Sequence, residues 1–135
     1  MGLFSGTRPD NLGVRDGRLA PPKPTPNNVH SQIDKAADPG HFIEPLRFQG
    51  DPGKAWEKLQ SVVNGMERVT VVKSEAGYLY AEFSTRLMGY VDDVEFMLDE
   101  KAGAIQVRSA SRLGSSDFGV NRERIESIRA GLARE

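Results

Sequence analysis

The sequence predicts a single α+β domain in which two helices pack on one face of an antiparallel sheet. Four short β-type runs, separated by turn residues, lie between residues 68 and 111, with one helical run before them and another after them. Strands that are grouped together, rather than alternating with helices, are typical of α+β domains. A chain of 135 residues, 38% of them hydrophobic and none of them cysteine, is expected to fold by packing around one modest core.

Residues 1–40 are predicted to form a proline-rich extended arm, largely irregular, ahead of a domain at residues 41–135. The arm holds six of the eight prolines and few large apolar residues. Such a composition buries too little surface to offset the entropy of the chain, and each proline fixes its own backbone. We therefore expect the arm to contribute little to the core, and its removal to leave a folded domain.

The predicted domain begins with a strand and a helix. Residues 42–48 alternate at the period of a strand, and Pro45, which has no N–H, places that strand at a sheet edge. Asp51 is the expected N-cap of the following helix, and Gly65 is expected at its end. The helical run KAWEKLQSVVNGM carries an apolar stripe formed by Ala55, Leu59, Val62 and Met66.

The four runs RVTVVKS, GYLYAEFST, YVDDVEFML and AIQVRSAS are predicted to pair as antiparallel hairpins. One parity of these strands is apolar and must face the helices: Val69, Val71, Leu79, Ala81, Phe83, Val94, Phe96, Leu98, Ile105 and Val107. The other parity is mostly polar: Tyr78, Tyr80, Glu82, Asp93, Glu95, Gln106 and Arg108. We expect this second face to be wet or to meet a partner, with a partly solvated pair between Arg108 and an acidic neighbour.

A cluster of polar residues is predicted where the last strand meets the last helix, GVNRERIESIRAGL. That helix presents the stripe Asn121, Ile125, Ile128 and Leu132 to the sheet. Strand parity places Asp92, Ser109 and Ser111 at the end of the apolar face, and Asn121 reaches the same end from the first helical turn. These four side chains are therefore expected to lie together.

This cluster has three interpretations. In the first, its groups satisfy one another and the first N–H groups of the helix, with Ser116 or Asp117 as the N-cap. In the second, it binds an anion or a small polar ligand with Arg112, Arg122 or Arg124. The third is an enzyme that uses Asp92 with Arg112. The candidate ligand-binding residues are Asp92, Ser109, Ser111, Arg112, Asn121 and Arg124.

Composition and motifs argue against several other functions. The net charge of -1 disfavours nucleic acid and anionic membranes as partners. Neither a signal peptide nor a membrane-spanning run is recognisable, so a soluble, cytoplasmic protein is expected. Asp92 and Asp93 point to opposite faces of one strand, which argues against a metal site, and no cofactor-binding motif is found.

The stretches PNNVHSQ, IEPL, YVDDVEFML and VRSASRLGSSDFGVNRERI together resemble an uncharacterised conserved-domain family, the domain of unknown function DUF1499, over residues 22–133. Family members usually carry cysteines where this chain has Pro22 and Asn28, and a serine where it has His30. The resemblance implies a shared domain and supplies no reaction. More remotely, the order of elements is similar to a shortened helix-grip fold, in which a curved sheet wraps a helix around an apolar cavity.

The expected function is therefore a non-enzymatic binding or interaction module, which meets another protein or its own copy through the polar sheet face. The alternative is a small-molecule binder with a cavity between sheet and helices, for an apolar or anionic ligand. A minor alternative is the enzyme that uses Asp92 and Arg112.

Overall fold

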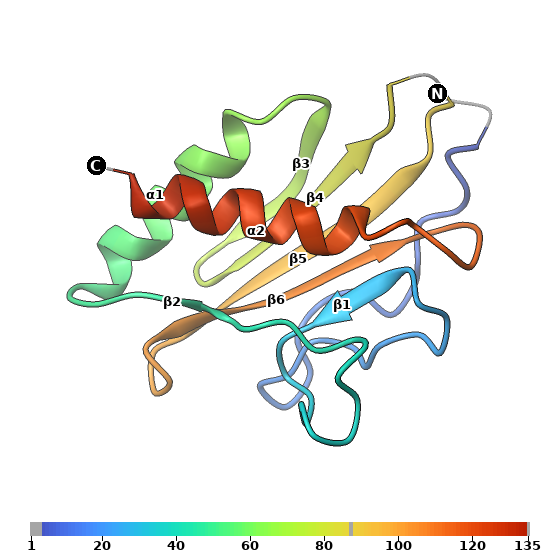
Figure 1. Ribbon diagram of the computed structural model, residues 1–135. Coiled ribbons are helices and arrows are strands. Elements are labelled where there is room, and N and C mark those ends of the chain that lie inside the picture. Colours follow the sequence, from blue (N-terminus) through green and yellow to red (C-terminus); the bar gives the residue numbers. More distant parts are fainter. Residues whose placement is uncertain (1–3, 87, 135) are drawn as a thin grey trace.

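The computed structural model describes residues 4–86 and 88–134, which form a six-stranded antiparallel sheet and two helices (Figure 1). The predicted α+β fold is confirmed. The elements are β1 (Asn28–His30), β2 (Leu46–Arg47), α1 (Pro52–Asn64), β3 (Val69–Glu75), β4 (Tyr78–Ser84), β5 (Val91–Asp99), β6 (Ala104–Ser111) and α2 (Val120–Ala133). The strands β3 to β6 form the predicted meander, and β1 and β2 both pair with β6, so they share its outer edge.

Local signals determine both ends of α1. The Asp51 carboxylate accepts a hydrogen bond from the Lys54 N–H at 3.0 Å, which makes Asp51 the predicted N-cap. The Gly65 N–H donates to the Ser61 carbonyl at 3.1 Å and ends the helix where it was expected to end. Neither helix in the described part of the chain is long and apolar enough to cross a membrane.

The start of α2 differs from the prediction that Ser116 or Asp117 is the N-cap. The N-cap is Gly119, whose φ of +80° lies in the left-handed region that glycine adopts readily. Asp117 lies two residues earlier, and its carboxylate accepts hydrogen bonds from the N–H groups of Gly119 at 2.9 Å and Asn121 at 3.1 Å. A side chain outside the helix therefore satisfies a donor of the first turn.

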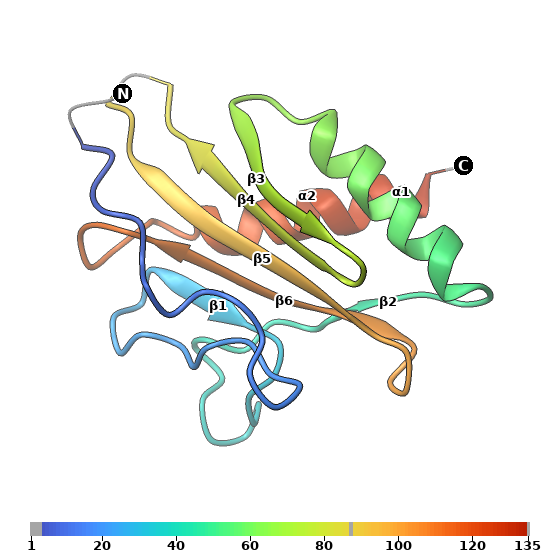
Figure 2. The same cartoon turned by 180° about the vertical axis from the view of Figure 1, so that it is seen from behind.

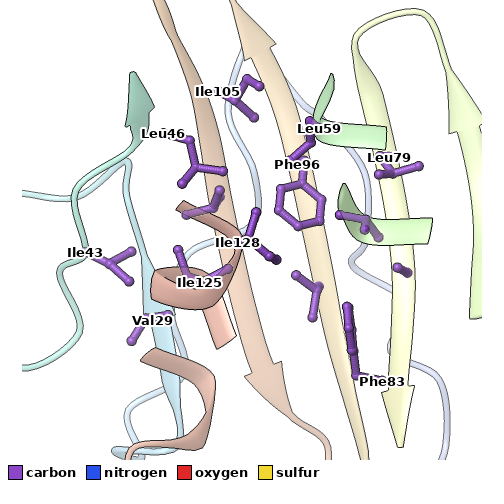
Figure 3. Close-up of a cluster of buried hydrophobic side chains, with 14 of the residues drawn as sticks. Val29, Ile43, Leu46, Leu59, Leu79, Phe83, Phe96, Ile105, Ile125 and Ile128 are labelled. Carbon is purple, nitrogen blue, oxygen red and sulfur yellow. The ribbon is translucent and has the colours of Figure 1, made fainter. Parts of the chain in front are cut away.

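The predicted apolar parity faces the helices and forms the main core (Figure 3). Val94 lies opposite Ala81 on β4 and Ser109 on β6, so the apolar residues of neighbouring strands share one face. The side chains that fill the space between the sheet and the helices are Leu59, Val63, Leu79, Phe96, Val107, Ile125 and Ile128. This layer is a packed core of interdigitated side chains.

The expectation that residues 1–40 contribute little to the core is wrong. Val29 on β1 is 4% exposed and belongs to the main core, and β1 extends the sheet by pairing with β6. Figure 2 shows the blue part of this segment, residues 4–20, crossing the face of the sheet opposite the helices. The few apolar residues of this segment do not recur at the period of a strand or a helix, so they give no pattern to read. The pairing of β1 depends on backbone groups that β6 offers at its edge, and composition does not reveal it.

The expectation of a wet polar face is also wrong. Tyr80, Asp93, Glu95 and Arg108 are each at most 3% exposed. Leu19 is buried with Tyr78, Tyr80 and Met97, and Leu12 packs against the same cluster. The N-terminal segment therefore covers the face that was predicted to meet a partner.

Candidate ligand-binding site at one end of the sheet

Five of the six predicted site residues converge where β5 and β6 meet the start of α2. The Ser109 hydroxyl donates to Asn121 Oδ1 at 2.6 Å, and Asn121 Nδ2 donates to Ser111 Oγ at 2.9 Å. Asp92 lies directly opposite Ser111 in the register of the two strands. We call Asp92, Ser109, Ser111, Asn121 and Arg124 the polar joint, because they connect the sheet to α2.

Arg124 is the partner of Asp92. Its guanidinium lies 2.8 Å from Asp92 Oδ2, and it donates to Asn121 Oδ1 at 3.2 Å. The same guanidinium lies over the Phe83 ring, 4.8 Å from the ring centre. Charge pairing and cation–π contact together hold Arg124 on the apolar face of the sheet. The sequence predicted that Asp92 lies beside Ser109, Ser111 and Asn121, but it did not identify Arg124 as the partner of Asp92.

Arg112 does not join the polar joint, and the predicted pairing of Asp92 with Arg112 is wrong. The Arg112 N–H still bonds to the Val91 carbonyl at 3.1 Å, so strand alternation continues to this residue and turns its side chain to the other face. There Arg112 Nε donates to Asp93 Oδ2 at 2.9 Å, and the guanidinium also pairs with Glu82. An enzyme that uses Asp92 with Arg112 has no geometric basis.

The groups of the polar joint are occupied by one another. Asn121 Nδ2 also contacts the carboxylate of Asp117 at 2.8 Å and the Asn27 carbonyl at 3.1 Å. Burial favours the neutral form of Asp117, but the hydrogen bonds from Asn121 and Gly119 outweigh it and hold the pKa of this carboxyl below its usual value. The first interpretation, in which these groups satisfy one another, describes this arrangement well.

A pocket of about 330 Å³ opens beside the polar joint. The turn between β4 and β5 lines one side and the loop between β6 and α2 lines the other, so the pocket brings together segments that are distant in sequence. Its polar lining residues are Thr85, Asp92, Ser111, Ser116 and Asp117. Its apolar walls are formed by Tyr90, Val91, Leu113, Phe118 and Val120.

Exposed apolar side chains gather around this pocket. In residues 4–86 and 88–134, the large apolar side chains that are exposed outside this region are Val14 and Val72. The others are Met88, Tyr90, Leu113, Phe118 and Val120, which we call the apolar end. Tyr90 is stacked on Phe4, with 5.0 Å between the ring centres. Solvent-exposed apolar groups concentrated in one place are a feature of interaction surfaces.

Phe118 is the most exposed member of the apolar end. Its side chain is 94% exposed, and its φ of +53° lies in the left-handed region that a bulky residue rarely adopts. The sequence analysis missed this residue. The available signal was a large apolar residue between Asp117 and Gly119, in a loop that is otherwise small and polar.

A second buried polar network lies on the opposite face of the sheet. Glu95 accepts hydrogen bonds from the Tyr78 hydroxyl and from the Gly13 N–H at 2.7 Å, and Arg108 Nη1 lies 3.7 Å from its other oxygen. Burial raises the pKa of Glu95 and lowers that of Arg108. This pair is fully buried, which corrects the expectation of a partly solvated one. In the described part of the chain, the buried side-chain atoms without a hydrogen-bond partner are Glu95 Oε1 and Arg108 Nε.

Metal binding finds no support in this geometry. Asp92 and Asp93 each pair with a different arginine on a different face. Across residues 4–86 and 88–134, no three histidine, aspartate or glutamate side chains are grouped as the ligands of an ion would be.

Comparison with known proteins identifies a family and no closer relative. The model of the family described as "Protein of unknown function (DUF1499)" matches residues 18–132. No curated protein and no solved structure matches the chain. The matched region includes all six strands, α1 and all but the last residue of α2, and it leaves out the part of the N-terminal segment before residue 18.

Proposed function

Since the chain belongs to the DUF1499 family, whose function is unknown, we propose from its geometry that it is a non-enzymatic binding module whose apolar end docks a protein partner. The observation that carries this proposal is the position of Phe118, which is 94% exposed at the rim of the pocket beside the polar joint. An apolar side chain of the partner would enter the pocket and pack against Phe118.

The cost of placing Phe118 in this way supports a role in binding. A bulky residue at φ of +53° is strained, and its ring contributes little buried surface to the folded chain. A partner that covers the ring would recover the apolar surface that folding leaves in water. Aromatic residues are enriched at the centre of protein interfaces for this reason.

The polar joint supports binding rather than catalysis. A catalytic base or nucleophile has to be available to a substrate, whereas Asp92 is held by Arg124 and the hydroxyl of Ser109 is bonded to Asn121. In the proposed module these groups keep the two loops of the apolar end in a defined position. The polar rim that Ser111 and Asp117 form beside the apolar walls is a common feature of interfaces.

We propose the apolar end as the partner surface, in place of the polar sheet face that the sequence suggested. Tyr78 and Tyr80 of that face are buried beneath the N-terminal segment, so a partner would first have to displace Leu12 and Leu19. A cavity between the sheet and the helices is equally disfavoured as the binding place, because Leu59, Ile125 and Ile128 fill that space. The apolar end is already exposed, so a partner can reach it without displacing a segment or opening the core.

Peptide selection on the immobilised protein tests this proposal. We expect a random displayed library to yield peptides with an apolar anchor residue, which shift the amide signals of residues 85–91 and 113–120. Binding should weaken at least tenfold, or by about 1.4 kcal/mol, in Phe118→Ser. The matched control is Val14→Ser, which replaces another exposed apolar residue outside the apolar end and should bind as the wild type does.

Three outcomes would contradict the proposal. These are a failure to enrich any peptide, equal binding by Phe118→Ser, and shifts confined to another surface. Sedimentation of the wild type and of Phe118→Ser separates self-association from binding to another protein, since a dimer lost in the variant would identify a second copy as the partner. A metabolite that raises the thermal midpoint of both proteins equally would support the small-molecule alternative instead.

A further inference from the structure

A tight turn in the N-terminal segment presents two arginines side by side. Arg15 and Arg18 exchange both backbone hydrogen bonds, at 2.9 and 3.1 Å, as a directly opposed antiparallel pair does. The residues between them, Asp16 and Gly17, have φ values of +53° and +73°, as the turn type with two left-handed residues requires. Directly opposed residues place their side chains on the same face, so both arginine side chains leave the turn on one side.

The charges of these two arginines are not compensated by an acid. Like charges directly opposite each other destabilise a strand pair. In the part of the chain that the structure describes, the arginines that pair with a carboxylate do not include Arg15 or Arg18. Each guanidinium instead donates to one carbonyl: Arg15 to Asn11 at 3.1 Å, and Arg18 to Gln32. These bonds orient the groups and leave most of their donors unused.

Both arginines line a pocket of about 410 Å³. Its other lining residues are Asn11, Leu19, Ala20, Pro21, His30, Gln32 and Ile33, with no aspartate or glutamate among them. The buried residues Leu19, Ala20 and His30 form its floor. The pocket therefore combines a cationic rim with a largely apolar floor.

His30 adds an independent indication of the local charge. Burial, together with the charges of Arg108 and Arg18, lowers the pKa of His30 to about 4. Arg108 is the direct partner of His30 in the pairing of β1 with β6, and it is 3% exposed. Arg108 is paired with Glu95, so the uncompensated positive charge of the pocket lies on its rim with Arg15 and Arg18, while His30 itself is neutral at pH 7.

We propose that this pocket binds a small ligand through an oxyanion group, a phosphate or a carboxylate, held by Arg15 and Arg18. Guanidinium groups match the planar geometry of such anions and bind them through paired hydrogen bonds. A bound anion would also relieve the repulsion between the two arginines. The apolar floor would take the body of the ligand. None of these residues lines the apolar end, so the site is independent of the proposed docking function.

Titration of the full chain with inorganic phosphate, followed by amide and arginine side-chain NMR signals at constant ionic strength, tests the proposal. We expect saturable shifts at Gly17, Leu19 and Gln32. Arg15→Gln and Arg18→Gln should each weaken phosphate binding at least tenfold. The matched control is Arg86→Gln, which removes an exposed arginine on the turn between β4 and β5 and should leave the affinity unchanged.

A parallel titration with acetate distinguishes the two anions. Saturation by both supports a general oxyanion site, and saturation by phosphate alone assigns it to phosphoryl groups. Linear shifts with both anions, or equal weakening by Arg86→Gln, would overturn the proposal. Thermal midpoints of the variants report whether each fold is intact. Should either glutamine variant unfold, Arg18→Lys keeps the charge but loses the paired hydrogen bonds, and undiminished affinity in that variant would also overturn it.

Discussion

Asp92 and Asp93 are neighbours in the chain, yet each forms an ion pair with an arginine on a different face of the sheet. Asp92 lies 2.8 Å from Arg124 of α2, and Asp93 lies 2.8 Å from Arg112. Arg112 also donates to the Ser5 carbonyl of the N-terminal segment at 3.3 Å. Because adjacent side chains of β5 point to opposite faces, these two aspartates anchor the layers that cover both faces of the sheet.

Asp92→Asn is expected to destabilise the fold by roughly 1 to 3 kcal/mol, because it removes the charge from a buried hydrogen-bonded pair. Chemical denaturation measures the change as a lower midpoint at unchanged slope. Arg124→Gln, alone and combined with Asp92→Asn, is the control, since two residues in contact should lose less together than the sum of the single losses. An unchanged or raised midpoint in Asp92→Asn would mean that this carboxylate is retained for binding rather than stability.

Phe96→Ala should cost about 3 kcal/mol, because the side chain is fully buried between the sheet and the helices and its removal leaves a cavity. Val72→Ala on β3, at an exposed position, should change stability by less than about 0.5 kcal/mol. Urea denaturation of both variants compares the two positions directly. A loss below about 1 kcal/mol in Phe96→Ala is not compatible with the observed core.

Deletion of the chain through Gln32 should strongly lower the unfolding midpoint. It removes β1 from the edge of β6 and exposes the buried Tyr80 and Glu95. The remaining chain, residues 33–135, contains the domain predicted at residues 41–135, so the same experiment tests whether that domain folds without most of the arm. Val14→Ala within the intact segment is the control, because this exposed side chain should contribute little. A deleted chain that unfolds at the wild-type midpoint would show that the cover is dispensable.

His30 should make the fold less stable as the pH falls from about 6.5 to about 4. Its Nδ1 accepts from the Gln32 N–H at 2.9 Å and its Nε2–H donates to the Ala20 carbonyl at 2.7 Å, so protonation breaks one bond. The folded pKa of about 4 lies below the ordinary 6.5. Between these values the unfolded chain binds the extra proton, so this contribution is present above pH 6.5 and is lost toward pH 4.

Urea denaturation between pH 4 and 7.5 measures how the free energy of unfolding depends on pH, and His30→Gln should reduce this dependence. His41 supplies a control of opposite sign. Its hydrogen bond to the Thr25 carbonyl raises its pKa, with Asp38 adding to the effect. The His41 contribution is therefore present below pH 6.5 and is lost as the pH rises through the raised value. Equal pH dependence in the wild type and in His30→Gln would refute the assignment.

Phe118→Gly should stabilise the fold by about 0.5 to 1 kcal/mol, since glycine adopts the left-handed conformation without strain. Phe118→Ala is the matched control, because alanine keeps the strain at φ of +53° and should bring no gain. Thermal and chemical denaturation of the three proteins report the difference. If glycine destabilises the chain, the ring makes a stabilising contact and its exposure is no sign of a binding role.

The periodic elements were predictable from the sequence. The parity that places Phe96 and Val107 in the core, the stripe of Ile125 and Ile128, and the cap at Asp51 were all predicted correctly. Strand parity also predicted that Asp92, Ser109 and Ser111 lie together, and the helical stripe predicted that Asn121 joins them. These features follow from repeats of 2 and 3.6 residues and from neighbours along the chain, so they need no knowledge of distant segments.

The tertiary structure alone decided what covers the second face and which arginine meets which acid. Residues 5–33 carry no period, so their docking depends on the exposed edge of β6 and on the apolar patch around Tyr78, both distant in sequence. Asp92 had several donors within reach, and only the approach of α2 selected Arg124 over Arg112. Backbone periodicity determines the face to which a side chain points, whereas its partner depends on chain segments that packing brings together from far along the sequence.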